Sequence, residues 1–392
     1  MERIVRGAQP DEMDKVLDFC GELFGASRTY FEARFRTCPP ANPADSRVAM
    51  VGDRIASHIR IYRRELRLRG TSVPGGCLSE VMSHPDFRRQ GHGGAVIRDC
   101  MHYIRSLGYP IALVSSGVNE FYCSADMVRF PQIATTLAIP QWRVALPPDV
   151  RVRRYERGGA DDKAVAEIYE EYNRRRNLSV VRDAEYWRLH YSWIRHEAED
   201  GFLIAERDGS PVGYCRATNA ALSELGLRDG HHDAGLALVD AMVQRAAKLK
   251  ESTLGILLPA NETLITQFPR LRYKRELSEH IMLRVIDLKA LLDAALETAA
   301  ERLSAVGRTG THTLALEVLG QKCAIHVEKG QASAESLPET AAATPLAQKE
   351  FLKLVFGATL EKDLAAFTPE EQRLLRDLFP PDGPVCWRAD VL

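Results

Sequence analysis

A glycine-rich connection between a strand and a helix is the feature that most restricts what this chain can fold into. The connection, HPDFRRQGHGG, follows an expected strand over 78–83. After it, five apolar residues fall on one helical face with i, i+1, i+4, i+5, i+8 spacing, namely Val96, Ile97, Cys100, Met101 and Ile104. Gly108 ends this helix, and 111–115 reads as a buried strand. Strand, glycine loop, helix and strand in succession indicate an α/β sheet.

The same loop is suited to holding an anion. Glycines let the backbone approach a ligand closely, and the first turn of a helix offers N–H donors with a partial positive charge. Arg88 and Arg89 add positive charge, so a diphosphate is the expected ligand. The loop lacks Gly-Lys-Ser/Thr, which argues against a P-loop NTPase, and its spacing is not the GxGxxG of a Rossmann site. The plain alternative is a glycine-rich connection without a ligand.

Strands dominate before the loop, which favours a mixed sheet over a doubly wound one. We expect strands over 4–6, 47–50, 55–62 and 65–69, with a break at Arg63-Arg64 and a hairpin turn at Gly52-Asp53. A helix is expected from Asp11, as N-cap, through Leu23.

After Pro140 and Pro147-Pro148 the succession of elements repeats with an offset of about 140 residues, which indicates a duplication. The expected elements are helices over 165–172, 186–194 and 234–249, and strands over 202–206, 212–217, 222–227 and 254–258. From Leu288 the pattern changes to a small α+β unit. It contains helices over 291–303, 346–356 and 371–379 and a hairpin formed by 314–319 and 323–328.

Composition excludes several classes of protein. The 392 residues carry 52 Lys+Arg against 53 Asp+Glu, so the basic excess of a nucleic-acid-binding protein is absent. No apolar run approaches the ~20 residues that cross a bilayer, and the start of the chain lacks the apolar core of a signal peptide, which indicates a cytoplasmic protein. Eight scattered cysteines without a CxxC indicate buried thiols, with no disulfide framework and no metal site.

The loop resembles the acetyl-CoA loop of the GNAT superfamily of N-acetyltransferases. Arg88-x-x-Gly91-x-Gly93 fits its R/Q-x-x-G-x-G/A signature, and the flanking strand and amphipathic helix strengthen the match. The resemblance implies acetyl-CoA as co-substrate. It implies that the backbone of Val81, Met82 and Ser83 holds the acyl-pantetheine. The diphosphate would lie on the segment formed by Arg88, Arg89, Gln90, Gly91, His92, Gly93 and Gly94.

Downstream, the segment SSGVNEFY lies where the superfamily places a catalytic tyrosine, with Gly117 and Asn119 beside the cofactor. The resemblance makes Tyr122 the acid that protonates the CoA thiolate. A phenol of pKa ~10 protonates a thiol of pKa ~8.5 only when it is well positioned. The alternative for Tyr122 is a half-buried helix aromatic. Where the family continues with Gly-Phe, this chain has Asp126-Met127, and Asp tolerates the left-handed backbone.

The whole chain resembles the Eis ("enhanced intracellular survival") family. This implies tandem GNAT folds, one active over 1–145 and one degenerate over 146–286, followed by a sterol-carrier-protein-like α+β domain over 287–392. In that family the terminal carboxylate, here of Leu392, is the general base, and members form homo-oligomers and acetylate polycationic small molecules or lysines. Glu80 is the competing base, its alternative being a surface strand residue.

The second repeat carries a different loop. Its counterpart, LRDGHHDAG over 227–235, has two aspartates in place of the paired glycines and arginines, so we expect no CoA there. The side chains of His231 and His232 point in different directions because the two residues are adjacent. We therefore expect solvated loop residues that bind no metal. Cys123, beside Tyr122, has no His–Cys arrangement that would make it a nucleophile. Two rival functions stay open at this point, a lipid- or sterol-binding protein and a CoA-sensing protein without catalysis.

Overall fold

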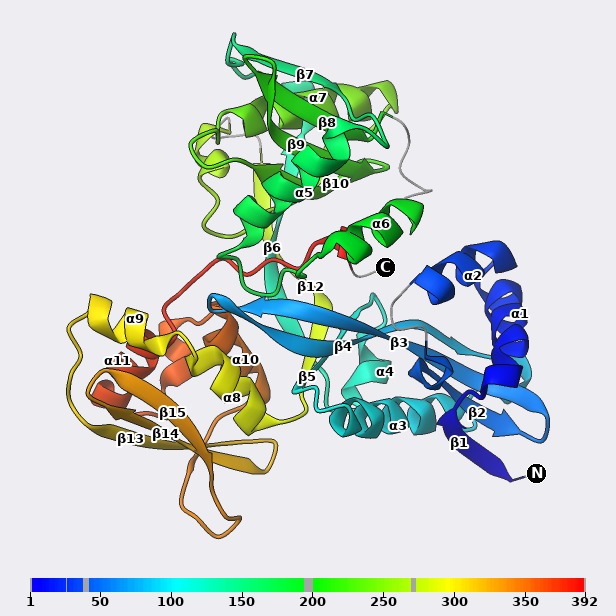
Figure 1. Ribbon diagram of the computed structural model, residues 1–392, viewed down its shortest axis with the longest axis vertical. Helices are drawn as coiled ribbons and strands as arrows, with labels where there is room; N and C mark the ends of the chain where they lie inside the picture. Colours follow the sequence, from blue (N-terminus) through cyan, green and yellow to red (C-terminus); the bar gives the residue numbers. More distant parts are fainter. Residues whose placement is uncertain (1, 26, 38–41, 194–199, 269–272, 391–392) are drawn as a thin grey trace. The chain divides into compact units, whose positions relative to one another are not determined.

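The computed structural model describes residues 2–25, 27–37, 42–193, 200–268 and 273–390 (Figure 1). The chain divides into two compact units. The N-terminal unit contains residues 2–130 and 279–381, and the second unit contains 131–278 and 382–390. The expected C-terminal domain thus shares a compact unit with the first repeat. The three consecutive domains expected from the sequence stay a prediction.

A mixed sheet forms the centre of the N-terminal unit, as the sequence predicts. Its strand order is β1-β2-β3-β4-β5-β12, and only β4 and β5 are parallel. The strands are β1 (Arg3–Gly7), β2 (Ser46–Val51), β3 (Arg54–Leu68), β4 (Thr71–Ser83), β5 (Ile111–Ser115) and β12 (Tyr273–Val285), of which 281–285 pair with β5. Because β4 and β5 are parallel, a crossover must connect them, and the helix after the glycine loop supplies it.

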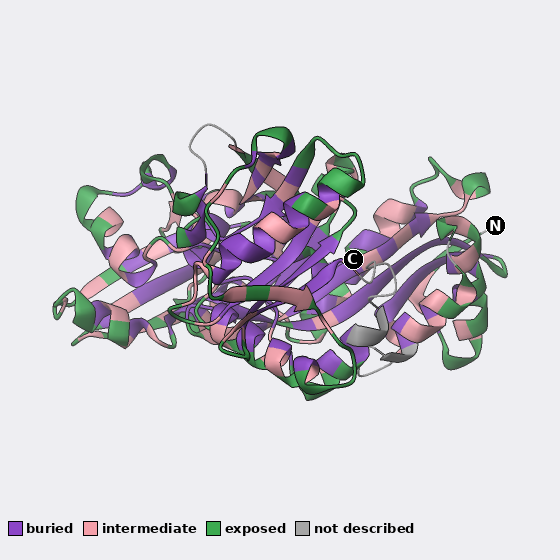
Figure 2. Ribbon diagram, turned by 90° about the horizontal axis from the view of Figure 1, so that it is seen from above, coloured by how far each residue is buried: buried purple, intermediate pink, exposed green. Residues whose placement is uncertain are grey.

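Helices cover both faces of this sheet. α3 (His92–Ser106) buries Val96, Ile97 and Ile104 against residues that include Ile59 and Ile61 of β3. α1 (Met13–Phe24) and α2 (Arg28–Thr37) pack with apolar residues of β2 and β4 in a separate cluster. Figure 2 shows the strands buried along most of their length. Side chains alternate along a strand, so β3 turns Arg60, Tyr62 and Arg64 to the face opposite Ile59 and Ile61.

Two expectations for the N-terminal unit are wrong in detail, and two elements were not predicted. β3 is one strand of 15 residues, without a break at Arg63-Arg64. The charges are tolerated because Arg63 binds Asp45 at 2.9 Å. The first helix starts at Met13, after a 3-10 turn over Pro10–Glu12, so Asp11 is not its N-cap. α2 and β12 were not expected, since neither has a clear apolar period.

The C-terminal elements of this unit form a small α+β arrangement, as predicted. A four-stranded sheet has the order β15-β14-β13-β16. The strands are β13 (His312–Val318), β14 (Gln321–Glu328), β15 (Gln331–Ser336) and β16 (Thr344–Pro345). The helices are α8 (Leu288–Leu296), α9 (Ala299–Ala305), α10 (Gln348–Phe356) and α11 (Pro369–Leu378). The single helix expected over 291–303 is therefore two helices.

Arg69, at the turn between β3 and β4, connects these elements to the large sheet. Its guanidinium donates to the carbonyls of Leu354, Val355 and Pro380 at 2.9, 2.7 and 2.6 Å. Two of these carbonyls lie in the last turn of α10, where the helix dipole favours a cation. The contact explains why the C-terminal elements belong to the N-terminal unit.

The second unit repeats the element order of the first. Its strands are ordered β6-β11-β10-β9-β8-β7, and β10 and β11 form a parallel pair as β4 and β5 do. They are β6 (Val128–Ala138), β7 (Val150–Arg154), β8 (Phe202–Arg207), β9 (Ser210–Thr218), β10 (Ala221–Leu227) and β11 (Thr253–Leu257). The helices are α5 (Ala160–Asn173), α6 (Ala184–Trp193) and α7 (Ala234–Lys248). β6 was missed by the sequence reading.

The segment 382–390 packs into the second unit. The Trp387 side chain is buried and donates to Asn173 Oδ1 at 2.8 Å, and Cys386 N–H donates to Gln132 Oε1 at 2.7 Å.

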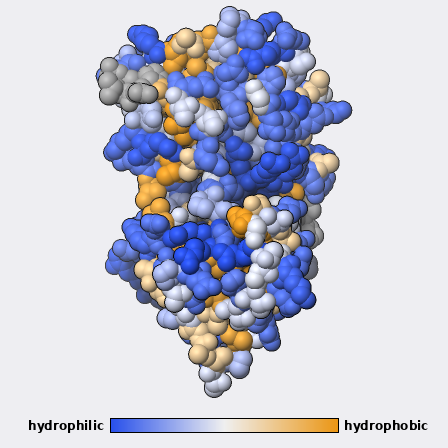
Figure 3. Space-filling view, turned by 90° about the vertical axis from the view of Figure 1, so that its left-hand side faces the viewer, coloured by the Kyte–Doolittle hydropathy of each residue, from blue (hydrophilic) through white to orange (hydrophobic). Residues whose placement is uncertain are grey.

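Hydrophilic side chains cover most of the molecular face drawn in Figure 3. Among the residues that the structure describes, no helix has the length and hydropathy needed to span a membrane.

Candidate active site

The end of β4 opens away from β5. The parallel register runs from Gly75 with Ile111 to Leu78 with Val114, whereas β4 continues to Ser83. The register with β3 shifts between His58 and Arg60, so β4 carries a bulge here. Ser57 Oγ donates to the Met82 carbonyl at 2.7 Å. Bulges re-aim strand residues next to functional sites, and this one bends the segment of Val81, Met82 and Ser83.

The glycine loop starts α3 with backbone donors facing outward. Gly91, the N-cap, has a φ of 78° and Arg89 one of 60°, both left-handed. The first helical hydrogen bond joins Ala95 N–H to the Gly91 carbonyl at 3.1 Å. The amides of residues 92–94 precede that bond and have no carbonyl one turn earlier within the helix. This is the geometry that an anion site at a helix N-terminus requires.

The space beside Gly93 is tight for a side chain, whereas the space beside Gly94 is ordinary. A Cβ at Gly93 would lie 3.1 Å from Phe121 Cε2 and 3.3 Å from Ser83 Oγ. A Cβ at Gly94 would lie 3.5 Å from an Arg98 nitrogen. The loop thus brings the end of β4, the start of α3 and α4 (Asn119–Cys123) together.

Four arginines surround the loop, of which sequence reasoning found two. Arg88 Nε donates to the Ser83 carbonyl at 3.4 Å, and Arg89 and Gln90 are exposed. Arg3 on β1 donates to the Gly91 carbonyl at 3.4 Å, and Arg98 lies beside Gly94. Burial lowers the pKa of His92, and the positive charge of Arg3 lowers it further. Arg98 follows the glycines by about one helical turn, so its position near the loop was predictable from the sequence. The position of Arg3 was not, because β1 reaches the loop only through pairing in the sheet.

Tyr122 lies on α4 and is more deeply buried than the sequence reading allowed, with 6% of its surface exposed. It belongs to the apolar cluster on the α3 side, and Val81 packs against that cluster. Burial raises the pKa of Tyr122, and a hydrogen bond with Ser116 opposes that shift. The phenol therefore keeps its proton at neutral pH, as an acid must.

Gly117 and Asn119 have different surroundings. Gly117 is exposed, and a Cβ there would meet nothing within 4 Å. The Asn119 amide, oriented to satisfy both neighbours, donates to the Ser116 carbonyl at 3.1 Å and accepts from Arg129 Nε at 3.0 Å. After α4, Asp126 has a φ of 54°, so it takes the left-handed conformation expected for the position where the family has glycine.

Glu80 is not a surface residue, which corrects the alternative considered for it. It sits in the β4 bulge with a φ of 43° and is 4% exposed. Arg34 of α2 lies 3.2 Å from its Oε1, and Tyr62 Oη donates to the same oxygen at 3.2 Å. Burial raises the pKa of Glu80, and Arg34 and Arg60 oppose that shift. A bulge interrupts the alternation of side chains along a strand, and Glu80 lies in the interior at this bulge.

The carboxylate of Leu392 lies outside the described residues. The last described residue, Asp390, is buried in the second unit. The role expected for Leu392 therefore stays a prediction.

The corresponding loop of the second repeat is closed by protein contacts. A Cβ at Gly235 would lie 2.8 Å from Leu264 and 2.9 Å from Leu227. Asp233 caps α7 and binds Arg207 at 2.6 Å. His231 and His232 are only partly solvated, since they contact Arg207 and Glu262. Among the described residues, no group of three or more His, Cys, Asp or Glu is arranged to hold a metal.

Comparisons with known proteins agree with this geometry. Residues 4–125 match the family described as "Acetyltransferase (GNAT) domain". No curated protein matches the chain in sequence. Residues 4–125 are therefore similar to a GNAT acetyltransferase domain, and this likeness implies an acyl-CoA co-substrate and an amine acceptor.

Solved structures match over almost the full length. A probable N-acyltransferase from Enterococcus faecalis V583 has a TM-score of 0.76 and 14% identity, with 99% of each chain covered. A GCN5-related N-acetyltransferase from Anabaena variabilis has a TM-score of 0.73 and 13% identity, covering 98% of this chain and 99% of that one. Eis1 from Mycobacterium abscessus has a TM-score of 0.67 and 14% identity, with 98% and 99% covered. At these identities the likeness is one of fold.

Proposed function

We propose that the chain transfers an acetyl group from acetyl-CoA to the amine of a small molecule or of a lysine by direct attack, without an acyl-enzyme. The observation that carries the proposal is the open end of β4, which lies next to the glycine loop and to the buried Tyr122. An acetyl thioester held along Val81, Met82 and Ser83 would have its diphosphate at the start of α3.

The chemistry requires several proton transfers. The neutral amine attacks the thioester carbonyl carbon, the C–S bond breaks, and Tyr122 gives its proton to the leaving thiolate. The nitrogen then loses a further proton to become the amide, and this proton restores the phenol of Tyr122 through solvent. The phenol of Tyr122 is buried, and burial keeps it protonated until the thiolate forms. The amine arrives as an ammonium and must first lose a proton, so a base is required.

The base is the Leu392 carboxylate or Glu80. The resemblance to the Eis family supports Leu392. The geometry supports Glu80, because burial raises the pKa of its carboxyl and a carboxylate with a raised pKa is a stronger base at neutral pH. We further propose that residues 287–392 take a sterol-carrier-protein-like fold and that the chain forms homo-oligomers, as the same resemblance implies.

Release of CoA thiol in the presence of amines tests the proposal. Tyr122→Phe should lower kcat by roughly 10²–10⁴-fold and leave CoA binding unchanged. Tyr103→Phe, on α3, where the hydroxyl donates to Asp45 at 2.9 Å, serves as the control. Removal of residues 391–392 and Glu80→Gln separate the two bases. Unchanged turnover in Tyr122→Phe would show that the acid is assigned wrongly.

One rival, a lipid-binding role for the C-terminal elements, has less support. It expects an apolar cavity, whereas the pocket of about 400 Å³ described beside α8 is lined by polar side chains that include Asp287, Lys289, Gln321, Lys322 and Glu339. The other rival, CoA sensing without catalysis, predicts CoA binding with no thiol release for any amine. The same assay separates it from catalysis.

A further inference from the structure

Ser116 is fixed in place directly after β5, in the loop that leads to α4 and Tyr122. Its backbone N–H donates to the His280 carbonyl at 2.8 Å, and its own carbonyl accepts from the Asn119 amide at 3.1 Å. Its side-chain oxygen, Oγ, accepts from the Val118 N–H at 2.9 Å. Both the backbone and the hydroxyl of Ser116 are therefore held by hydrogen bonds.

The fixed hydroxyl of Ser116 contacts the phenol of Tyr122. The two side chains form a hydrogen bond. The ring of Tyr122 lies edge-on to Phe121, with 5.0 Å between the ring centres, and it belongs to an apolar cluster that includes Ile97 and Val114. Ser116 thus provides a polar contact to a phenol whose ring has mainly apolar surroundings.

Ser116 also lies between the buried phenol and solvent. Tyr122 is 6% exposed, whereas Ser116 is half-buried. The two residues after it, Gly117 and Val118, are exposed, Val118 with 69% of its surface. Because the loop faces solvent, water reaches the Ser116 hydroxyl more readily than it reaches the phenol.

The hydroxyl of Ser116 has the capacity to act as both acceptor and donor toward Tyr122. A serine hydroxyl offers one hydrogen and two lone pairs, and the Val118 N–H occupies one lone pair of Oγ. The nearest carbonyl for the hydrogen, that of Val118, is 3.4 Å away, which is long for an O–H···O hydrogen bond. The hydrogen is therefore free to turn toward a phenolate oxygen. Burial raises the pKa of Tyr122 and the hydrogen bond with Ser116 lowers it, as a donor to the phenolate does.

The proposed reaction leaves Tyr122 without its proton after every turnover. The phenolate that remains is buried, and burial disfavours a charged group, so the proton must return before the next thiolate forms. The proton that the acceptor nitrogen loses passes into solvent. Each cycle therefore includes a proton transfer from solvent to the phenolate of Tyr122.

The second repeat lacks a hydroxyl at both corresponding positions. The residue directly after β11, which corresponds to β5, is Leu258. Leu264 packs beside Gly235 as Phe121 packs beside the glycine of the first repeat, and the residue after Leu264 is Ile265. Leu258 and Ile265 are both buried. The repeat with the closed glycine loop therefore has apolar residues where the first repeat has serine and tyrosine.

We infer that Ser116 relays the returning proton to Tyr122. The phenolate oxygen takes the hydrogen of Ser116 as the Oγ–H bond breaks, and Oγ takes a proton from a water molecule at the surface of the loop. One proton passes from solvent to Tyr122, and Ser116 ends unchanged. The inference rests on the proposed function and adds to it a residue that acts through Tyr122.

The first turnover and the later ones separate this role from a structural one. The full chain, saturated with acetyl-CoA, is mixed rapidly with spermidine or with lysine, and the acetylated amine is measured in the first turnover and in the steady state. Tyr122 starts protonated, so Ser116→Ala should change the first-turnover rate by no more than about threefold and lower the steady-state rate by roughly tenfold or more. Ser116→Thr keeps a hydroxyl and should restore most of the steady-state rate.

Two further variants complete the experiment. Ser115→Ala removes an exposed hydroxyl from the preceding residue and is the matched control, with both rates unchanged. Ser116→Cys, which is close in size and only a weak hydrogen-bond donor, should reproduce the loss if Ser116→Ala fails to fold.

Two results would overturn the relay. One is a steady-state rate in Ser116→Ala equal to that of the unmodified chain. The other is an equal loss in the first turnover and in the steady state, which would give Ser116 a purely positioning role. Tyr122→Phe should slow both phases, so a wrong assignment of the acid is recognised separately. If the unmodified chain acetylates neither amine, the proposed function itself fails.

The contact between the two side chains is tested without any acceptor. In protein labelled with fluorotyrosine, the fluorine NMR signal of Tyr122 is identified by its absence in Tyr122→Phe. Loss of the Ser116 hydroxyl should move the titration of this signal to higher pH, because the phenolate loses a donor. An unchanged titration in Ser116→Ala would show that Ser116 does not interact with the phenol.

Discussion

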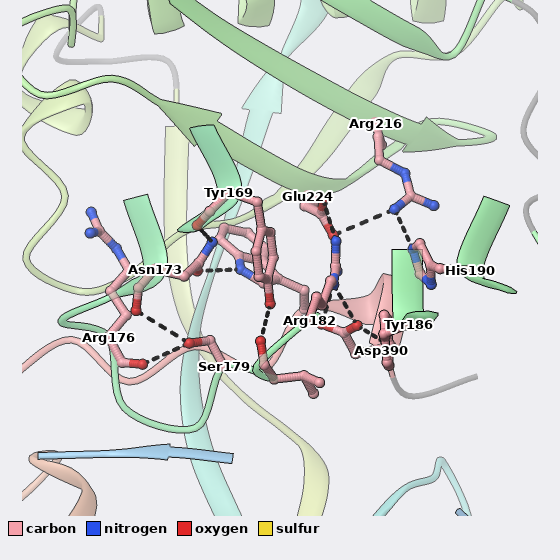
Figure 4. Close-up of polar contacts among 12 residues, drawn as sticks. Tyr169, Asn173, Arg176, Ser179, Arg182, Tyr186, His190, Arg216, Glu224 and Asp390 are labelled. Atoms are coloured by element: carbon pink, nitrogen blue, oxygen red, sulfur yellow. Dashed lines mark hydrogen bonds and ion pairs between the residues drawn. The ribbon is translucent and has the colours of Figure 1, made fainter. Parts of the chain in front are cut away.

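The guanidinium of Arg182 donates two hydrogen bonds of 2.9 Å to the carboxylate of Asp390, 208 residues further along the chain (Figure 4). Both side chains are fully buried, and Tyr186 Oη donates to the same carboxylate at 2.5 Å. Arg182 also binds Glu224 on β10. This pair attaches the end of the described chain to the second repeat.

Loss of the Asp390 carboxylate should destabilise the second unit. Asp390→Ala leaves Arg182 with one buried counter-charge in place of two, and breaking a buried pair typically costs ~3–5 kcal/mol. The measurement is urea unfolding followed by tryptophan fluorescence, since Trp387 is buried in the same segment. Arg388→Ala, an exposed neighbour, should change the free energy of unfolding by no more than about 0.5 kcal/mol. Equal midpoints for the two variants would show that the Arg182–Asp390 pair adds nothing to stability.

Much of the fold was predictable where it depends on local pattern. The glycine loop, α3 and β5 follow from spacing within about thirty residues, and so do the hairpins. β6 and β12 pair with strands distant in sequence, β6 with β11 and β12 with β5, and their own residues show no clear alternation. Arg63-Arg64 suggested a break because the buried partner of Arg63, Asp45, is recognisable only in the folded sheet.

The candidate site divides in the same way. The loop residues and Tyr122 were predictable because each lies in a short sequence motif. The burial of Glu80 depends on a bulge and on Arg34 from another element, and Arg3 approaches Gly91 only because β1 is brought beside the loop. Motifs therefore predicted the residues proposed to bind the cofactor, whereas the burial of Glu80 and the position of Arg3 could be known only from the tertiary structure.

Gly93→Asp should weaken CoA binding, measured by calorimetry, by at least tenfold. Its Cβ would lie 3.1 Å from Phe121, and its carboxylate would add negative charge where the diphosphate is expected. Gly159→Asp places the same side chain at the N-cap of α5, at a φ of −121°, and should leave CoA affinity unchanged. Unaltered binding in Gly93→Asp would remove the loop from the cofactor site.

Arg3 and Arg98 should contribute a salt-dependent part of CoA affinity. They lie beside Gly91 and Gly94, and exposed charges act on a phosphate mainly at low ionic strength. Arg3→Gln and Arg98→Gln should each lower affinity roughly two- to fivefold at low salt, and less in 1 M salt, in line with about 0.2–1 kcal/mol for exposed pairs. Arg28→Gln, an exposed arginine at the start of α2, is the control. A loss that is independent of salt would argue for a packing role instead.

Acid should destabilise the N-terminal unit through His58. Burial lowers the pKa of His58 to about 3, the hydrogen bond that His58 Nδ1 donates to the Glu80 carbonyl opposes this shift, and Arg60 adds to it. With an ordinary pKa of 6.5, the unfolded state binds a proton between pH 6.5 and 3 that the folded state does not. The His58 contribution is therefore intact above pH 6.5 and is lost as the pH falls.

For His58 alone the expected loss between pH 7.0 and 5.5 is about 1.3 kcal/mol in the free energy of unfolding. His58→Gln should show a shallower pH dependence than the unmodified chain. The difference between the two slopes isolates His58, because every other group titrates in both proteins. His102→Gln, on the exposed side of α3, should leave the slope unchanged. Identical slopes for His58→Gln and the unmodified chain would mean that the imidazole takes up its proton equally in the folded and unfolded states, contrary to its burial.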